Sequence, residues 1–150
     1  MDKEITTTEV TDQVKAFLEH VNYIIEEPEI PKEFMGKPDF YGKREQDKTY
    51  EICGLTKQGL KDIPRAITHL WTLKRQLGHE VNYVIALPLV SEKDLAALLA
   101  ADKNKLLKKV KRDNFVIWLC DPEAKSIVSV HGTPQDDIFS KHIQSKELSF

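Results

Sequence analysis

Two acidic residues stand in neighbouring β-prone segments and have the chemistry of a metal site. Asp39 follows a proline in PDFYG (38–42), and Glu51 lies in KTYEICGL (48–55). If the segments pair as a hairpin about REQD, Asp39 and Glu51 fall within about one register step of each other. Carboxylates on adjacent strands suit Mg²⁺ or Mn²⁺, which can activate water and neutralise a phosphate. We therefore predict a hydrolytic metal site.

Each acid also has a plainer interpretation. Taken singly, Asp39 is a turn residue and Glu51 is an exposed position of an edge strand. Side chains alternate along a strand, so Glu51 and Cys53 point to one face while Tyr50 and Ile52 serve the other. An unrelated α/β domain without a site is indicated if the two acids lie far apart.

The segment PDFYGKREQDKTYEICG (38–54) resembles the PD-(D/E)xK nuclease superfamily, whose fold is that of restriction endonucleases and Holliday-junction resolvases. Pro38 and Asp39 match the first half of the family motif. Glu51 matches its acidic position, and Gly54 matches a glycine that is frequent there. The order helix, hairpin, helix, strand also fits this family.

The resemblance covers roughly residues 10–130 and implies both a fold and an activity. The fold would be α/β, a restriction-endonuclease-like mixed sheet flanked by helices. The activity would be hydrolysis of nucleic acid phosphodiester bonds, by in-line attack of water activated by Mg²⁺ or Mn²⁺. Asp39 and Glu51 would hold the metal, and Glu19 of the first helix would lend a further carboxylate. A solvated helix position is the alternative for Glu19.

Cys53 departs from the family pattern, because it stands where the family has its catalytic lysine. A neutral thiol cannot supply that cation's help in orienting water or stabilising charge. The role of the lysine would pass to Lys57 or Lys61, or metal alone would support activity, or activity would be lost. In the last case the chain would be a catalytically inactive member of the fold, serving as a nucleic-acid-binding or protein-interaction module.

Basic residues give candidate contacts to nucleic acid. The resemblance implies that the helix after the motif lies beside the site, and a partly buried structural histidine is the alternative for His69 there. The basic run KNKLLKKVKR (103–112) either contacts phosphates or is a solvated helix face. The predicted contacts are Arg65, His69, Lys105, Lys108, Lys109 and Arg112.

The overall charge limits the class of partner. A formal net charge of −2 argues against a protein that coats nucleic acid by bulk electrostatics, but it leaves room for local contacts. DNA is favoured over RNA as the partner, and the sequence is compatible with a homodimer. No glycine-rich phosphate loop or zinc-ligand spacing occurs in the chain.

Apolar periodicity predicts the elements that position these residues. A first helix over 8–27 ends before Pro28, and the family's first strand is missing because EIPKEFMGK (29–37) is a poor strand. Gly78 suits the C′ position of the helix that follows the hairpin. The remaining elements are a buried strand over 81–90, a helix beginning after Ser91 that Asp102 interrupts, and two strands over 115–121 and 125–132.

Length and composition indicate an ordinary globular protein. We expect a single domain over 1–150 with a flexible tail at about 133–150, since 41% of the residues are hydrophobic and 31% charged. No apolar run approaches the roughly 20 residues of a membrane helix. Cys53 and Cys120 both fall in strand-like segments and do not suggest a disulfide framework. We expect a cytoplasmic protein.

Overall fold

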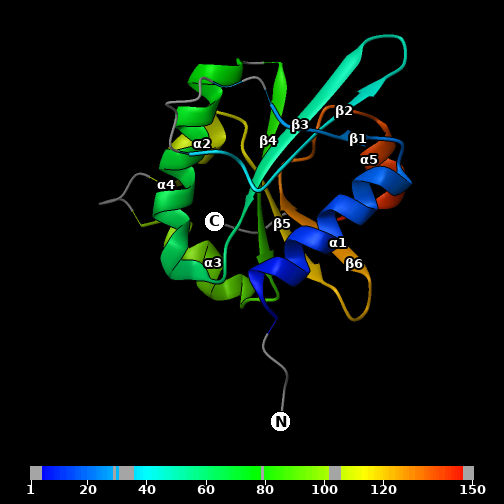
Figure 1. Ribbon diagram of the computed structural model, residues 1–150. Helices are drawn as coiled ribbons and strands as arrows, with labels where there is room; N and C mark the ends of the chain where they lie inside the picture. The colour runs from blue at the N-terminus through cyan, green and yellow to red at the C-terminus, as the bar shows by residue number, and fades with distance from the viewer. Residues whose placement is uncertain (1–4, 29, 31–35, 79, 102–105, 147–150) are drawn as a thin grey trace.

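The computed structural model describes residues 5–28, 30, 36–78, 80–101 and 106–146. In this part of the chain, helices pack on both faces of one sheet (Figure 1). One face carries three helices, α2 (Ile63–Leu77), α3 (Glu92–Leu99) and α4 (Leu106–Arg112). The other face carries α1 (Thr7–His20) and α5 (Ile138–His142). A 3₁₀ turn, η1 (Leu60–Asp62), leads into α2.

Seven strands follow one another in chain order across the described sheet. They are β1 (Ile24–Ile25), β2 (Phe40–Glu45), β3 (Thr49–Thr56), β4 (Val81–Pro88), β5 (Val116–Asp121), β6 (Ser126–His131) and β7 (Gln144–Ser145). Strands β1, β2 and β3 form an antiparallel meander, while β3, β4 and β5 are parallel. The pair β5–β6 is antiparallel and the pair β6–β7 parallel. The predicted mixed α/β fold with flanking helices is confirmed.

Each face of the sheet buries its own hydrophobic core. Alternate residues of β3 go to different cores, so Cys53 packs on the α2 side and Ile52 on the α1 side. Strand β4 is buried on both faces, which explains why residues 81–88 are almost entirely apolar. The strand predicted over 81–90 ends at Pro88. Trp118 of β5 is fully buried beneath α1.

Helix α2 turns one stripe to the sheet and the opposite stripe outward. Its buried residues are Ile63, Ala66, Ile67, Leu70 and Leu73. On the outward side, Trp71 keeps 43% of its surface exposed. Gly78 follows the helix with a φ of 98°, a left-handed conformation that favours glycine, as the sequence predicts.

The first helix is shorter than predicted, and it is followed by a first strand, which the sequence predicted to be missing. Helix α1 ends at His20, and Asn22 takes a φ of 72°, which turns the chain back toward the sheet. Ile24 and Ile25, predicted as part of the helix, form β1 and pair with Lys43 and Gly42 of β2. The prediction was wrong because a pair of apolar residues fits the helical and the strand periodicity equally well. The left-handed turn at Asn22, which ends the helical pattern, leaves no trace in that periodicity.

The later elements agree with the sequence except near the tail. The helix predicted after Ser91 is divided into α3 and α4, and the proposed interruption at Asp102 lies outside the described residues. Residues 133–146, predicted as a flexible tail, contain α5 and β7. Phe139 of α5 is fully buried and packs near Trp118, with ring centroids 5.8 Å apart. This segment therefore contributes to the core beneath α1.

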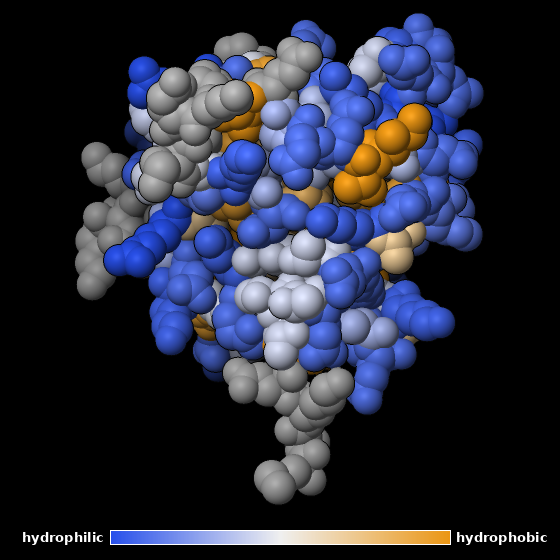
Figure 2. All heavy atoms as spheres, viewed as in Figure 1, coloured by the Kyte–Doolittle hydropathy of each residue, from blue (hydrophilic) through white to orange (hydrophobic). Residues whose placement is uncertain are grey.

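The face of the molecule seen in Figure 2 is mostly hydrophilic. A small hydrophobic area lies where Figure 1 shows β1, the strand whose Ile24 is 69% exposed. Among the described helices, none is long and apolar enough to cross a membrane.

A buried carboxylate ties the C-terminal segment to the first strands. Asp136 is 2% exposed and accepts hydrogen bonds from the Arg44 guanidinium at 2.8 and 2.9 Å. It also accepts one from the Tyr23 hydroxyl at 2.8 Å and one from the backbone N–H of Ile138 at 3.2 Å. Burial, followed by the hydrogen bond to Asp136, raises the pKa of Tyr23, so this phenol stays a donor.

Removing this carboxylate should destabilise the whole domain. We expect Asp136→Ala to lower the free energy of unfolding by about 3–5 kcal/mol, because a nearly buried guanidinium loses its partner. Urea unfolding followed by circular dichroism measures the change. Asp137→Ala is the matched control, since Asp137 is exposed and makes no side-chain cap bond to α5. Equal losses in the two variants would contradict the assigned role of Asp136.

Candidate functional site

The β2–β3 hairpin has a tighter turn than the sequence suggests. Glu45 pairs with Thr49, and the turn between them is closed by a hydrogen bond from the Gln46 N–H to the Lys48 carbonyl at 3.0 Å. This register places Lys43 opposite Glu51 and Phe40 opposite Gly54. Asp39 and Glu51 are therefore not within one register step of each other, and that prediction was wrong. The turn lies one residue later than REQD, so two residues taken for the connector, Arg44 and Glu45, belong to β2.

Asp39 lies at the end of the hairpin remote from the turn. Its backbone N–H donates to the Gly54 carbonyl at 2.9 Å, and its carboxylate accepts from the Thr56 N–H at 2.8 Å. Gly54 and Thr56 lie three and five residues beyond Glu51, or about 10 and 17 Å of extended strand. The Asp39 side chain thus closes the end of the strand pair while remaining exposed to solvent.

Glu51 is held by a tyrosine from the neighbouring strand. The Tyr41 hydroxyl donates to a Glu51 carboxylate oxygen at 2.5 Å. Burial, followed by this hydrogen bond and the Glu51 charge, raises the pKa of Tyr41, so the phenol remains protonated. Sequence reasoning did not single out Tyr41. Only the strand register identifies it, because the register places Tyr41 opposite Cys53.

Cys53 lies between the two carboxylates along β3 and is fully buried. Burial, and then the charges of Asp39 and Glu51, raise the pKa of the Cys53 thiol. The thiol is therefore neutral at physiological pH, and it supplies neither a cation nor a thiolate ligand. The two acids lie on either side of this position along the hairpin, Glu51 beside Tyr41 and Asp39 at Thr56.

Gly54 has a packing explanation. The Phe40 ring lies across the glycine, and a Cβ at position 54 would come within 2.1 Å of the Phe40 Cζ atom. Both residues belong to the α1 side of the sheet, away from Cys53. The glycine that matches the family pattern is thus required by the contact between the two strands.

The lysines proposed as substitutes lie at different distances from Glu51. Lys57 follows β3, six residues or about 20 Å of extended strand beyond Glu51, and is closer to the Asp39 end. Lys61 is exposed in η1. Lys43, which sequence reasoning did not single out, stands opposite Glu51 in the register. Its ammonium lies 6.0 Å from the centre of the Tyr41 ring and 3.5 Å from the Glu26 carboxylate.

Glu19 and the predicted nucleic-acid contacts lie on different layers. Glu19 is exposed on α1, on the face of the sheet opposite to the Cys53 core. His69 of α2 is half-buried, with Nε2 2.6 Å from the carbonyl oxygen of Gly36, so it contacts the segment that leads to Asp39. Arg65 is exposed on α2. Lys108, Lys109 and Arg112 are exposed on α4, and Lys105 lies outside the described residues.

The donor set fits a divalent ion only in part. Within the described ranges, no three His, Cys, Asp or Glu side chains form a group that could hold a metal. Mg²⁺ is often bound through one or two carboxylates, with water and substrate phosphate completing the shell. Glu51 can supply such an oxygen if it shares or releases its bond to Tyr41. Asp39 lies at the other end of the strand pair, so in this conformation the two acids do not form one ligand pair.

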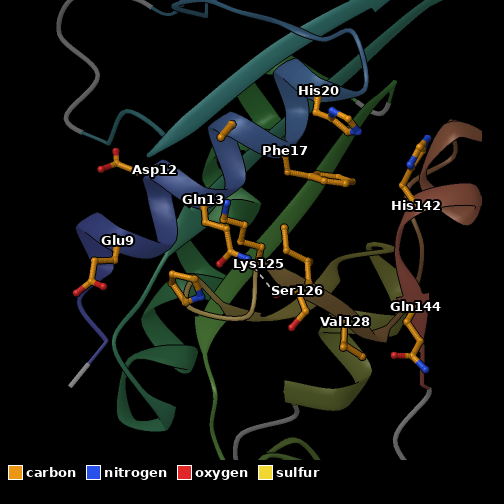
Figure 3. Close-up of a pocket in the computed structure, with 13 residues that line it drawn as sticks. Glu9, Asp12, Gln13, Phe17, His20, Lys125, Ser126, Val128, His142 and Gln144 are labelled. Carbon is orange, nitrogen blue, oxygen red and sulfur yellow. Dashed lines mark hydrogen bonds between the residues drawn. The ribbon is translucent and has the colours of Figure 1, made fainter. Parts of the chain in front are cut away.

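A large groove lies on the other side of the sheet, between α1 and the β6–β7 region (Figure 3). It has a volume of about 870 Å³, and His20 faces His142 at one end with ring centroids 5.8 Å apart. Glu9 and Asp12 line it from the first half of α1. The groove is thus separate from Asp39, Glu51 and Cys53, which are not among its lining residues.

The described fold is that of a mixed α/β protein with a seven-stranded sheet between helical layers. It is similar to the crystal structure of an XisH family protein from Nostoc punctiforme, with a TM-score of 0.53 and 17% sequence identity. The match covers 79% of this chain and 95% of that one, and at this identity the likeness is one of fold. No family model and no curated protein matches the chain.

The state of the two cysteines can be tested with a thiol reagent. Cys53 is buried with a raised pKa, and burial raises the pKa of Cys120 to about 12, so thiolate is scarce at pH 8. We expect Ellman's reagent to label neither residue in the native protein and both after denaturation. A Cys120→Ala variant assigns the signal to Cys53. Fast native labelling of that variant would contradict a buried, neutral thiol.

Proposed function

We propose that the chain is a divergent member of the PD-(D/E)xK nuclease superfamily that hydrolyses nucleic acid phosphodiester bonds with Mg²⁺ or Mn²⁺. One observation carries the proposal: the hairpin places Glu51 and Asp39 on either side of position 53, where this superfamily has its lysine, with Tyr41 opposite Cys53 and bonded to Glu51. The fold supports it, because a helix, an antiparallel meander, a helix and a parallel strand follow in the expected order. DNA is the proposed substrate.

The chain's own residues have defined tasks in this proposal. Glu51 would hold the metal, and Asp39 would add a second carboxylate from the open end of the hairpin. The metal would supply a water molecule of lowered pKa and neutralise phosphate charge. Tyr41 stays protonated and keeps Glu51 oriented toward the Cys53 side of the hairpin through its hydrogen bond. Lys43 stands across from Glu51 and would supply the positive charge that Cys53 lacks by leaving its ion pair with Glu26.

A specific observation favours a second function, that of an inactive module that binds nucleic acid or another protein. The Cys53 thiol is fully buried and neutral, so the position of the motif lysine contributes no charge. Glu51 is also engaged by Tyr41. In this alternative the hairpin is a purely structural element. Asp39 closes the end of the strand pair by accepting a hydrogen bond from the Thr56 N–H.

Metal binding separates the two functions. We expect Mn²⁺ at about 100 times its Kd to add about 2.7 kcal/mol to stability, which raises Tm by about 5–10 °C in a domain of this size. Glu51→Gln should abolish the shift, and it keeps an acceptor for Tyr41. Glu45→Gln is the matched control, because Glu45 is exposed at the end of β2.

The same variants are then assayed for cleavage of DNA with Mn²⁺. Wild type and Glu45→Gln should cleave, and Glu51→Gln should lose at least about a hundredfold in rate if metal-bound charge is required. Equal cleavage by all three proteins, or no cleavage by any, would reject the hydrolytic function. The absence of both the thermal shift and cleavage would support the inactive module.

Replacing the thiol with lysine tests whether the two acids converge on position 53. We expect Cys53→Lys to destabilise the protein less than Cys120→Lys, by about 2–3 kcal/mol, because Asp39 and Glu51 can pair with the new ammonium. Cys120 is equally buried and has no charge among the causes of its raised pKa. Urea unfolding measures both variants. Equal losses would mean that the carboxylates do not reach position 53.

A further inference from the structure

A groove on the outer surface of the α2 layer combines an exposed aromatic ring with positive charge. It lies between α2 and α4 and has a volume of about 240 Å³. Its lining residues are Ile67, Thr68, Trp71, Lys109, Arg112 and Asp113. We call it the Trp71 groove. Trp71 is 43% exposed, whereas Trp118, the other tryptophan, is fully buried.

One cation contacts the exposed ring, and two more line the groove. The Arg75 guanidinium lies 4.9 Å from the centre of the Trp71 ring, a cation–π contact. Lys109 and Arg112 enter the groove from α4, and the Arg112 side chain is 59% exposed. The acid that lines the groove, Asp113, is 11% exposed and lies 3.5 Å from the Lys74 ammonium and 3.3 Å from the Arg112 guanidinium. Its charge is thus offset by two cations.

We propose that the Trp71 groove binds single-stranded nucleic acid. A base would stack on Trp71, and Lys109 and Arg112 would contact the flanking phosphates. A single strand is required because the faces of bases in a duplex are covered by their neighbours, whereas every unpaired base offers a face to an aromatic ring. Charge complementarity favours this polyanion over an apolar peptide.

The inference deepens the proposed function, on which it rests for the class of ligand, by naming the strandedness of the nucleic acid. The groove is distinct from the carboxylate site. His69, two residues before Trp71, contacts Gly36 beside the start of the hairpin, while Trp71 faces α4. Binding in the groove therefore needs neither metal nor Glu51.

The experiment is a fluorescence titration with an oligothymidylate in EDTA. Stacking should quench Trp71, and emission from the buried Trp118 should remain. We expect Trp71→Ala, followed by the anisotropy of a labelled oligonucleotide, to weaken binding about five- to a hundredfold. Lys109→Ala should reduce the slope of log K against log salt by about 0.7. Lys141→Ala, an exposed lysine of α5 on the opposite face, is the control and should leave binding unchanged.

Three outcomes would overturn the inference. They are unchanged affinity in Trp71→Ala, equal losses in Lys109→Ala and Lys141→Ala, and duplex DNA of the same sequence binding as tightly as the single strand. Glu51→Gln separates this inference from the proposed hydrolysis. If wild type never cleaves but Trp71→Ala loses binding, the groove stands and the hydrolytic function fails. If Glu51→Gln abolishes cleavage while Trp71→Ala binds normally, the hydrolytic function stands and the groove is rejected.

Discussion

The register of the β2–β3 hairpin is the constraint on which the candidate site depends. A tight turn pairs Glu45 with Thr49, and every later pair follows from that choice. A slip of one residue would move Cys53 from the α2 core to the α1 core and bring the Phe40 ring off Gly54. The surroundings of Cys53 are thus fixed by the hydrogen bonds and packing of the hairpin.

The Asp136 cluster supports this hairpin from the end of the chain. Arg44 belongs to β2, and its guanidinium is held by a carboxylate that lies more than ninety residues later and precedes α5. Tyr23 joins the same carboxylate from the segment that leads into β1. The first three strands are therefore braced by the C-terminal segment, which also fills the core with Phe139.

Much of the fold could be predicted from the sequence, because apolar periodicity is a local property. It located α2, the buried strand β4 and the β5–β6 pair. The register could not be predicted, since it depends on which residues form the turn at Gln46–Lys48. Asp136 was missed for a related reason: its partners are distant in sequence, and the tail lacks periodicity. At the candidate site, Glu51 and Cys53 were expected on one face, whereas Tyr41 and Lys43 become evident only once the register is known.

Two adjacent positions of β3, 53 and 54, pack in different layers of the protein, and the contact between Phe40 and Gly54 belongs to only one of them. Position 53 faces the α2 layer, and position 54 faces the α1 layer. A substitution at position 53 therefore acts on the α2 layer and leaves the contact between Phe40 and Gly54 in place. A hairpin of this kind separates the environment of one residue from the packing of the next at the scale of a single peptide bond.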